Sequence, residues 1–242
     1  MATRAPRRTI ETTADQLRAI VLDCEVGALI GSEEALLAKL GCSRITMRQV
    51  ARLLEREGLL KVRRGINGGY FASRPDPKTI EAAVSTYLES LDVDPQDVTV
   101  IASALWVEAM RKAAAADAAE ARASAERMRR LVEAVRDSAT FEEVREVELA
   151  IQRAVFDLAR SAYIKLIFDI NVAYSRRMLT TPIDDDSQDH QTFVRAWRNA
   201  KLLEAGAIAQ GDPELAGMAG RHSRQLWHER LRRRFAPAAG AL

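Results

Sequence analysis

The segment from Gly41 to Gly58 constrains the fold more than any other part of the chain. Ser43 is a favourable helix N-cap and Gly58 a favourable stop, so the residues between them are predicted to form one helix. At about 100° per residue, one half of this helix carries Thr46, Met47, Val50, Ala51, Leu53 and Leu54. The other half carries Arg44, Arg48, Gln49, Arg52, Glu55 and Arg56. One half can therefore pack on a core, while the other presents a row of guanidinium groups to its surroundings.

The flanking segments decide between an ordinary solvated helix and part of a larger motif. Residues 32–40 are predicted to form a short helix that Gly41 closes, which places two helices around a tight turn. Downstream, residues 59–62 and 70–73 are predicted to be strands, joined by the turn Arg63-Arg-Gly-Ile-Asn-Gly-Gly69. Helix, turn, Arg-bearing helix and basic hairpin together favour a winged helix-turn-helix over a solvated helix.

In this region the sequence resembles the GntR-type winged helix-turn-helix over about residues 10–74. The positions that agree in register include Ser32-Glu33, Leu36, Leu40-Gly41, Ser43-Arg44, Thr46, Arg48, Leu54-Glu55, Gly58-Leu59-Leu60, Arg64-Gly65 and Gly68. Glu34 departs from the pattern, because the family often has a basic residue there.

The resemblance implies a protein that binds double-stranded DNA as a homodimer on a palindromic operator. The helix after Ser43 is expected to enter a major groove, and the hairpin to touch the minor groove or the backbone. The expected DNA-binding residues are Ser32, Arg44, Thr46, Arg48, Gln49, Arg52, Arg63, Arg64, Gly65, Asn67 and Gly68.

The distribution of charge along the chain supports DNA binding better than the net charge does. The 242 residues carry a net charge of only +2, but residues 1–74 hold 13 Lys and Arg against 8 Asp and Glu. The remainder has a net charge of −3, so a basic module precedes a mildly acidic body. The sequence has no run of about 18 apolar residues and no apolar leader, and Cys24 and Cys42 lack zinc-like spacing. These features predict a cytoplasmic protein without a membrane segment.

Beyond Pro77 the strand signals stop, and the remaining sequence predicts helices only. The expected fold is mostly α: a winged helix-turn-helix with a small β-hairpin, then an all-α bundle of six or seven helices. The expected divisions are a basic tail (1–11), the winged module (12–74), a linker (75–78), the helical domain (79–235) and a C-terminal tail (236–242). The layout, with the turn Gly211-Asp212-Pro213, resembles the FadR-type ligand-binding domain of GntR regulators.

One helix of this domain places polar side chains in its apolar stripe. Glu148 and Gln152 fall in line with Val144, Ile151 and Val155. Buried polar groups need partners, so three alternatives are open: the two residues form a satisfied pair with a neighbouring Arg, a slight rotation of the helix exposes them, or they line a polar cavity inside the bundle.

The resemblance points to the same residues, because many FadR-type domains bind a divalent metal through one Asp and three His. The matching positions are Glu148, Gln152, Lys201 and the neighbourhood of Ser223, with His222 one residue off register. An amide and an ammonium are poor metal ligands, so no metal and no cofactor are expected. His190 and His228 lack ligand spacing and are expected at the surface. The expected effector site consists of Glu148, Gln152, Lys201 and His222, and the expected effector is a carboxylate or another acidic metabolite.

These features predict a transcriptional regulator, a repressor whose operator binding an effector controls. The alternatives are a constitutive DNA-binding regulator with a vestigial ligand domain, a metal-dependent sensor, and a helical-bundle enzyme. The sequence shows no nucleophile–base constellation, phosphate-binding loop or Glu-x-x-His pair for an enzyme.

Overall fold

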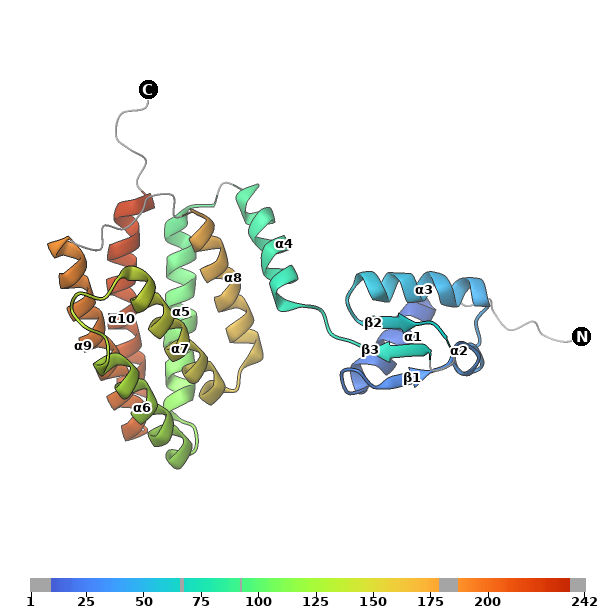
Figure 1. Cartoon of the computed structure of the whole chain (residues 1–242), viewed down its shortest axis with the longest axis horizontal. Coiled ribbons are helices and arrows are strands. Elements are labelled where there is room, and N and C mark those ends of the chain that lie inside the picture. Colours follow the sequence, from blue (N-terminus) through green and yellow to red (C-terminus); the bar gives the residue numbers. More distant parts are fainter. Residues whose placement is uncertain (1–9, 66–67, 92, 179–186, 236–242) are drawn as a thin grey trace, which may run out of the picture. The chain divides into compact units, whose positions relative to one another are not determined.

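A computed structural model describes residues 10–65, 68–91, 93–178 and 187–235. The chain divides into two compact units, Met1–Ile80 and Glu81–Leu242 (Figure 1). The described residues form ten helices and one three-stranded sheet, which confirms the predicted fold class. None of the helices within these ranges is long and apolar enough to span a bilayer.

The first unit is a winged helix-turn-helix. In chain order its elements are α1 (Ile10–Asp23), β1 (Leu29–Gly31), α2 (Glu33–Leu40), α3 (Arg44–Arg56), β2 (Leu60–Arg63) and β3 (Gly69–Ala72). The apolar halves of the three helices meet in a core of fully or nearly fully buried side chains that includes Leu17, Val21, Leu36, Met47, Val50 and Leu54.

Two serine caps and one glycine set the angle between α2 and α3. The Ser32 hydroxyl accepts a hydrogen bond from the Ala35 amide at the start of α2. Gly41 ends that helix in the left-handed conformation, with a φ of 61°, which only glycine adopts at little cost. The Ser43 hydroxyl then accepts from the Thr46 amide at 3.1 Å and starts α3. The predicted helix-turn-helix is therefore built from local signals.

The sheet has one strand more than the predicted hairpin. Its antiparallel order is β1-β3-β2, so the unpredicted strand β1 pairs with β3 on the side opposite β2. Leu29 pairs with Phe71, and Gly31 with Tyr70.

The second unit is an all-helical bundle. The boundary at Ile80 falls inside α4 (Pro77–Glu89), and the remaining helices are α5 (Pro95–Ala114), α6 (Ala118–Glu133), α7 (Phe141–Ala159), α8 (Ala162–Met178), α9 (Gln188–Gln210) and α10 (Pro213–Phe235). Helix α4 begins inside the segment expected as a linker, because Pro77 suits the first helical position and Asp76 accepts a hydrogen bond from the Lys78 amide.

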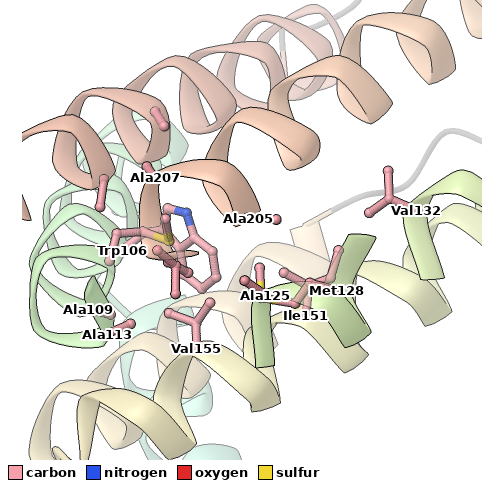
Figure 2. Close-up of a cluster of buried hydrophobic side chains, with 14 of the residues drawn as sticks. Trp106, Ala109, Ala113, Ala125, Met128, Val132, Ile151, Val155, Ala205 and Ala207 are labelled. Carbon is pink, nitrogen blue, oxygen red and sulfur yellow. The ribbon is translucent and has the colours of Figure 1, made fainter. Parts of the chain in front are cut away.

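The bundle is organised around α5, which contacts α7, α8, α9 and α10. Figure 2 shows Trp106 of this helix in the core beside small side chains such as Ala205 and Ala207. Its ring also makes an edge-on contact with Phe156, with ring centroids 5.9 Å apart. The small side chains let the helices approach closely, and the large indole fills the remaining space.

One expectation about histidine is wrong. His190 is fully buried, and its Nε2 lies 2.9 Å from the carbonyl oxygen of Ala139. This carbonyl belongs to the segment between α6 and α7, far from His190 in the sequence, so the residues around His190 do not reveal its partner.

Candidate nucleic-acid interface and bundle cavity

The helix α3 separates an apolar face from a basic face. Met47, Val50, Ala51 and Leu54 are buried, whereas the side chains of Arg44 and Arg48 are 64% and 65% exposed. Gln49 and Arg52 are exposed as well, and Thr46 is half-buried with its hydroxyl 2.9 Å from that of Ser43. This arrangement leaves one polar surface on α3 for a partner outside the chain.

Ile45 also lies on the exposed part of this helix, which the sequence analysis missed. It is 74% exposed at the second position of α3, although its side chain is fully apolar. Ile45 lies between Arg44 and Arg48 in the sequence, on the half of the helix that faces away from the core. Its exposure could have been predicted from that position.

The β2–β3 hairpin forms the wing, and glycines close its turn. Arg63 pairs with Gly69 across the two strands, and its guanidinium lies 4.5 Å from the centroid of the Phe71 ring. The Gly68 amide donates to the Gly65 carbonyl at 2.8 Å. A Cβ on Gly68 would lie 2.5 Å from the Arg63 carbonyl oxygen, so the turn needs glycine there. Asn67, another expected DNA-binding residue, lies outside the described residues.

A groove with a volume of about 790 Å³ runs between α3 and the wing. It brings together Arg48 and Arg52 from the helix and Arg63 and Arg64 from the wing. Three other expected residues also line it, namely Ser32, Gly65 and Gly68. Arg44, Thr46 and Gln49 are not part of its lining.

Three glutamates share the groove with the arginines, and each has a local contact. Glu33 lies 3.6 Å from Arg48, and Glu34 lies 3.7 Å from Arg44. The Glu55 carboxylate accepts a hydrogen bond from the Val62 amide at 3.0 Å and so ties the wing to α3. No ion pair involves Arg52, Arg63 or Arg64 among the described residues, which leaves these guanidinium groups available to an anion.

In the bundle, Glu148 and Gln152 are buried rather than exposed, and a second carboxylate, that of Glu204, lies beside them. The Lys201 ammonium of α9 lies 3.0 Å from Glu148 and 3.0 Å from Glu204. The indole nitrogen of Trp197 donates to Glu148 at 2.7 Å, and that of Trp106 donates to Glu204 at 2.7 Å. We call Glu148, Lys201 and Glu204 the buried triad.

The two carboxylates of the buried triad experience opposite shifts. Burial acts against the charge of Glu148, but the Lys201 ammonium and the Trp197 hydrogen bond hold its pKa below the usual value. Burial raises the pKa of Glu204, and the negative charge of Glu148 adds to this effect. Glu204 was not among the predicted site residues, although its position three residues after Lys201 puts the two side chains on one face of α9.

The buried triad does not suit a divalent metal. An ammonium stands between the carboxylates, where its positive charge would repel a second cation, and Gln152 donates its amide hydrogen to Glu148 at 3.1 Å. Among the described residues no group of three His, Cys, Asp or Glu is placed to hold a metal ion.

We therefore expect the purified protein to contain far less than one zinc, nickel or manganese per chain. Elemental analysis after gel filtration is the measurement. One metal per chain, with a fall in melting temperature on chelation, would contradict the expectation.

A small cavity lies beside the buried triad, with a volume of about 120 Å³. Its walls come from α5, α7, α8 and α10, through Thr99, Ala102, Phe141, Arg145, Glu148, Leu149, Gln152, Val172, Ser175, Arg224 and Trp227. Of the expected effector residues, Glu148 and Gln152 line it, whereas Lys201 lies behind Glu148. His222 is exposed and does not reach it, because the next two residues of α10, Ser223 and Arg224, are the ones that face inward.

The two units thus define a class of architecture: a winged helix-turn-helix with a basic groove, followed by a helical bundle with a small cavity. Neither the models of known protein families nor the curated proteins include a match to the sequence. Solved structures do match. The GntR protein of Streptococcus agalactiae is 16% identical, with 91% of this chain and 100% of that chain covered and a TM-score of 0.60.

Two further solved structures align over most of the chain with lower scores. E. coli McbR/YncC is 14% identical over 93% of this chain and 98% of its own, with a TM-score of 0.42. A GntR family member from Pseudomonas syringae pv. tomato is 16% identical over 92% and 86%, with a TM-score of 0.33. The chain shares its fold with a GntR regulator, as the sequence resemblance implied.

Proposed function

We propose that this protein is a transcriptional regulator that binds double-stranded DNA in a sequence-specific manner. The groove between α3 and the wing carries the proposal, because four arginines from two elements line one continuous surface there. A duplex presents a row of phosphates that such a surface can neutralise, and three of the four guanidinium groups have no ion-pair partner among the described residues.

The orientation of α3 supports base contacts at its N-terminal end. In a winged helix-turn-helix the second helix of the motif lies in the major groove with its first residues nearest the bases. These residues include Arg44 and Arg48, suited to guanine, and the exposed Ile45, suited to a thymine methyl group. Thr46 and Gln49 are the other residues proposed to contact base edges. Arg52, further along α3, is proposed to contact the phosphate backbone of the DNA.

The wing supports contacts outside the major groove. Arg63, the last residue of β2, and Arg64, the first residue after it, are both exposed. Gly65 and Gly68 have no side chain, so a phosphate can approach the backbone closely there. Ser32, the cap of α2, is exposed at the edge of the same groove and can donate its hydroxyl to a phosphate.

A second copy of the chain is the proposed partner of the helical domain. Several large apolar side chains from the end of α4 to the first half of α5 are exposed, namely Tyr87, Leu91, Val100 and Ile101. Burying them between two copies would remove apolar surface from water. The dimer would then present two winged helix-turn-helix units to the two halves of a palindromic operator.

We further propose that the protein is a cytoplasmic repressor and that an effector bound in the helical domain releases it from DNA. Repression needs only occupancy of a site near a promoter, whereas activation would need an additional contact with the polymerase. Effector control needs a binding site, and the cavity beside the buried triad is available for that role.

Selection of DNA fragments from a random pool tests the proposal. We expect the full-length protein to enrich an inverted repeat with half-site centres about one or two helical turns apart, and its affinity to fall steeply as salt rises. Failure to enrich any motif, or binding that is equal for all sequences, would contradict sequence-specific regulation. A single half-site without an inverted repeat would contradict the homodimer.

A further inference from the structure

Three carboxylates line the groove between α3 and the wing, and only two of them have a role within the protein. Glu55 accepts a hydrogen bond from the Val62 amide. The side chain of Glu33 is 27% exposed, and its Oε1 is buried 3.6 Å from the Nε of Arg48. The third carboxylate is that of Glu34, whose side chain is 73% exposed. It is the carboxylate in the groove that solvent reaches most freely.

The ion-pair neighbour of Glu34 is Arg44, which belongs to the other helix of the motif. The Oε1 of Glu34 lies 3.7 Å from the Nη2 of Arg44, which is longer than a hydrogen bond. Both side chains are mostly exposed, at 73% and 64%. An acceptor group and a donor group therefore lie side by side at the surface, and both remain available to another molecule.

A carboxylate on a DNA-binding surface lowers affinity unless it finds a hydrogen-bond donor, because the phosphates repel it. In the major groove the bases offer such donors at the amino groups of cytosine N4 and adenine N6. Arg44 is the first residue of α3, and in this motif the first residues of the second helix lie nearest the bases. Because Glu34 is next to Arg44, its carboxylate lies at the same end of the helix.

We propose that Glu34 and Arg44 together recognise one G·C base pair in each half of the operator. Arg44 donates to O6 and N7 of the guanine, and Glu34 accepts from the N4 amino group of the cytosine. Guanine O6 and cytosine N4 are hydrogen-bonded to each other and lie about 3 Å apart, so charged groups separated by 3.7 Å can contact both. The inference rests on the proposed function, because it assigns a base pair to the same DNA-binding surface.

The same two side chains disfavour the other base pairs to different degrees. With A·T or C·G in that orientation, an amino group faces the guanidinium and a carbonyl oxygen faces the carboxylate, so both contacts are lost. A T·A pair keeps thymine O4 opposite Arg44 and adenine N6 opposite Glu34, but it lacks the guanine N7. The expected order of affinity is therefore G·C, then T·A, then the other two pairs. Part of this specificity comes from repulsion by the carboxylate.

Selection from a random DNA pool by the full-length wild type, Glu34→Gln and Arg44→Gln proteins tests the inference. We expect the wild-type motif to contain one pair per half-site with the order above. Both variants should relax the preference at that same pair and keep the preferences elsewhere. A glutamine at position 34 can donate as well as accept, so it no longer distinguishes cytosine from thymine.

Fluorescence anisotropy on operators with each of the four pairs at this position measures the effect. The wild type should bind the A·T operator roughly 10- to 100-fold more weakly than the G·C operator, in the range of one mismatched base pair. For Glu34→Gln the same ratio should fall to less than about 3-fold. Its affinity for DNA without the motif should rise, because one negative charge is removed from the groove.

Glu25→Gln is the matched control, because Glu25 is an exposed carboxylate of the same unit that does not line the groove. It should leave the ratio between the four operators unchanged. Circular dichroism and thermal denaturation establish that each variant is folded, which is expected because Glu34 and Arg44 are mostly exposed.

The outcomes separate this inference from the proposed function. If the wild type selects a motif and folded Glu34→Gln keeps the same preference at every position, the inference is wrong and the DNA-binding function stands. The inference is also wrong if Glu34→Gln binds all sequences more tightly by one common factor, since Glu34 would then only repel phosphates. Relaxation at a pair other than G·C, or at different pairs in the two variants, would contradict it too. If the wild type selects no motif, the proposed function itself is wrong and the inference is overturned with it.

Discussion

Replacement of Arg48 by alanine is expected to weaken binding to the selected operator by roughly 10- to 100-fold, which corresponds to about 1–3 kcal/mol. Arg48 lies on the exposed face of α3 and also lines the groove shared with the wing, so its guanidinium can reach a base edge or a phosphate. If the lost contact is to a phosphate, the slope of log affinity against log salt should also fall by about 1. Fluorescence anisotropy at several salt concentrations measures both quantities.

The stability of the Arg48→Ala protein should change little. The side chain is 65% exposed, and its partner Glu33 is 3.6 Å away, so the pair contributes no more than about 1 kcal/mol. Arg56→Ala is the matched control, because Arg56 is exposed near the end of the same helix and does not line the groove. Equal losses of affinity in the two variants would show that total charge matters rather than the assigned surface. Unfolding of Arg48→Ala would assign the residue a structural role.

Much of the first unit could be predicted because its signals are local. Ser32 and Ser43 cap their helices through hydroxyl groups a few residues from the amides they accept, and the glycine at position 41 permits the turn between them. The apolar positions of α3 recur with the period of a helix and are the positions that the structure buries.

The third strand could not be predicted in this way. β1 comprises only Leu29, Ile30 and Gly31, too few residues to display the alternation of a strand. It is defined by its pairing with β3, about forty positions later, and contacts at that separation leave no periodic pattern in the sequence.

The bundle cavity was predicted only in part. Glu148 and Gln152 stand out because they interrupt an apolar stripe, and the structure buries both. His222 was expected beside them, but Arg224 faces the cavity instead. The step from position 222 to position 224 turns about 200° around a helix. A shift of one or two residues in matching α10 to the FadR-type pattern therefore selects the opposite face of the helix. Charged residues are frequent along this helix, so its sequence does not show which of them is buried.

The buried triad leads to the prediction with the largest expected effect on stability. Lys201→Met should lower the free energy of unfolding of the helical domain by about 3–5 kcal/mol, because it leaves two buried carboxylates without their shared cation. The Lys201 side chain is fully buried, and those of Glu148 and Glu204 are 6% and 0% exposed, so bulk solvent screens the two carboxylates poorly. Chemical denaturation of the wild type and the variant measures the difference.

The loss caused by Lys201→Met should be smaller at pH 5 than at pH 8. Without the ammonium, burial and mutual repulsion raise the pKa of both carboxylates in the folded state above that in the unfolded chain. The folded state then binds more protons, so its stability is retained at low pH and lost as the pH rises through the raised pKa values.

Adding Glu148→Gln and Glu204→Gln should remove this pH dependence and recover part of the stability. Lys165→Met is the matched control, because the side chain of Lys165 is 44% exposed where it pairs with Asp169. This variant should lose less than about 1 kcal/mol of stability. A Lys201→Met protein as stable as this control would show that the two carboxylates do not depend on the lysine for their charge balance.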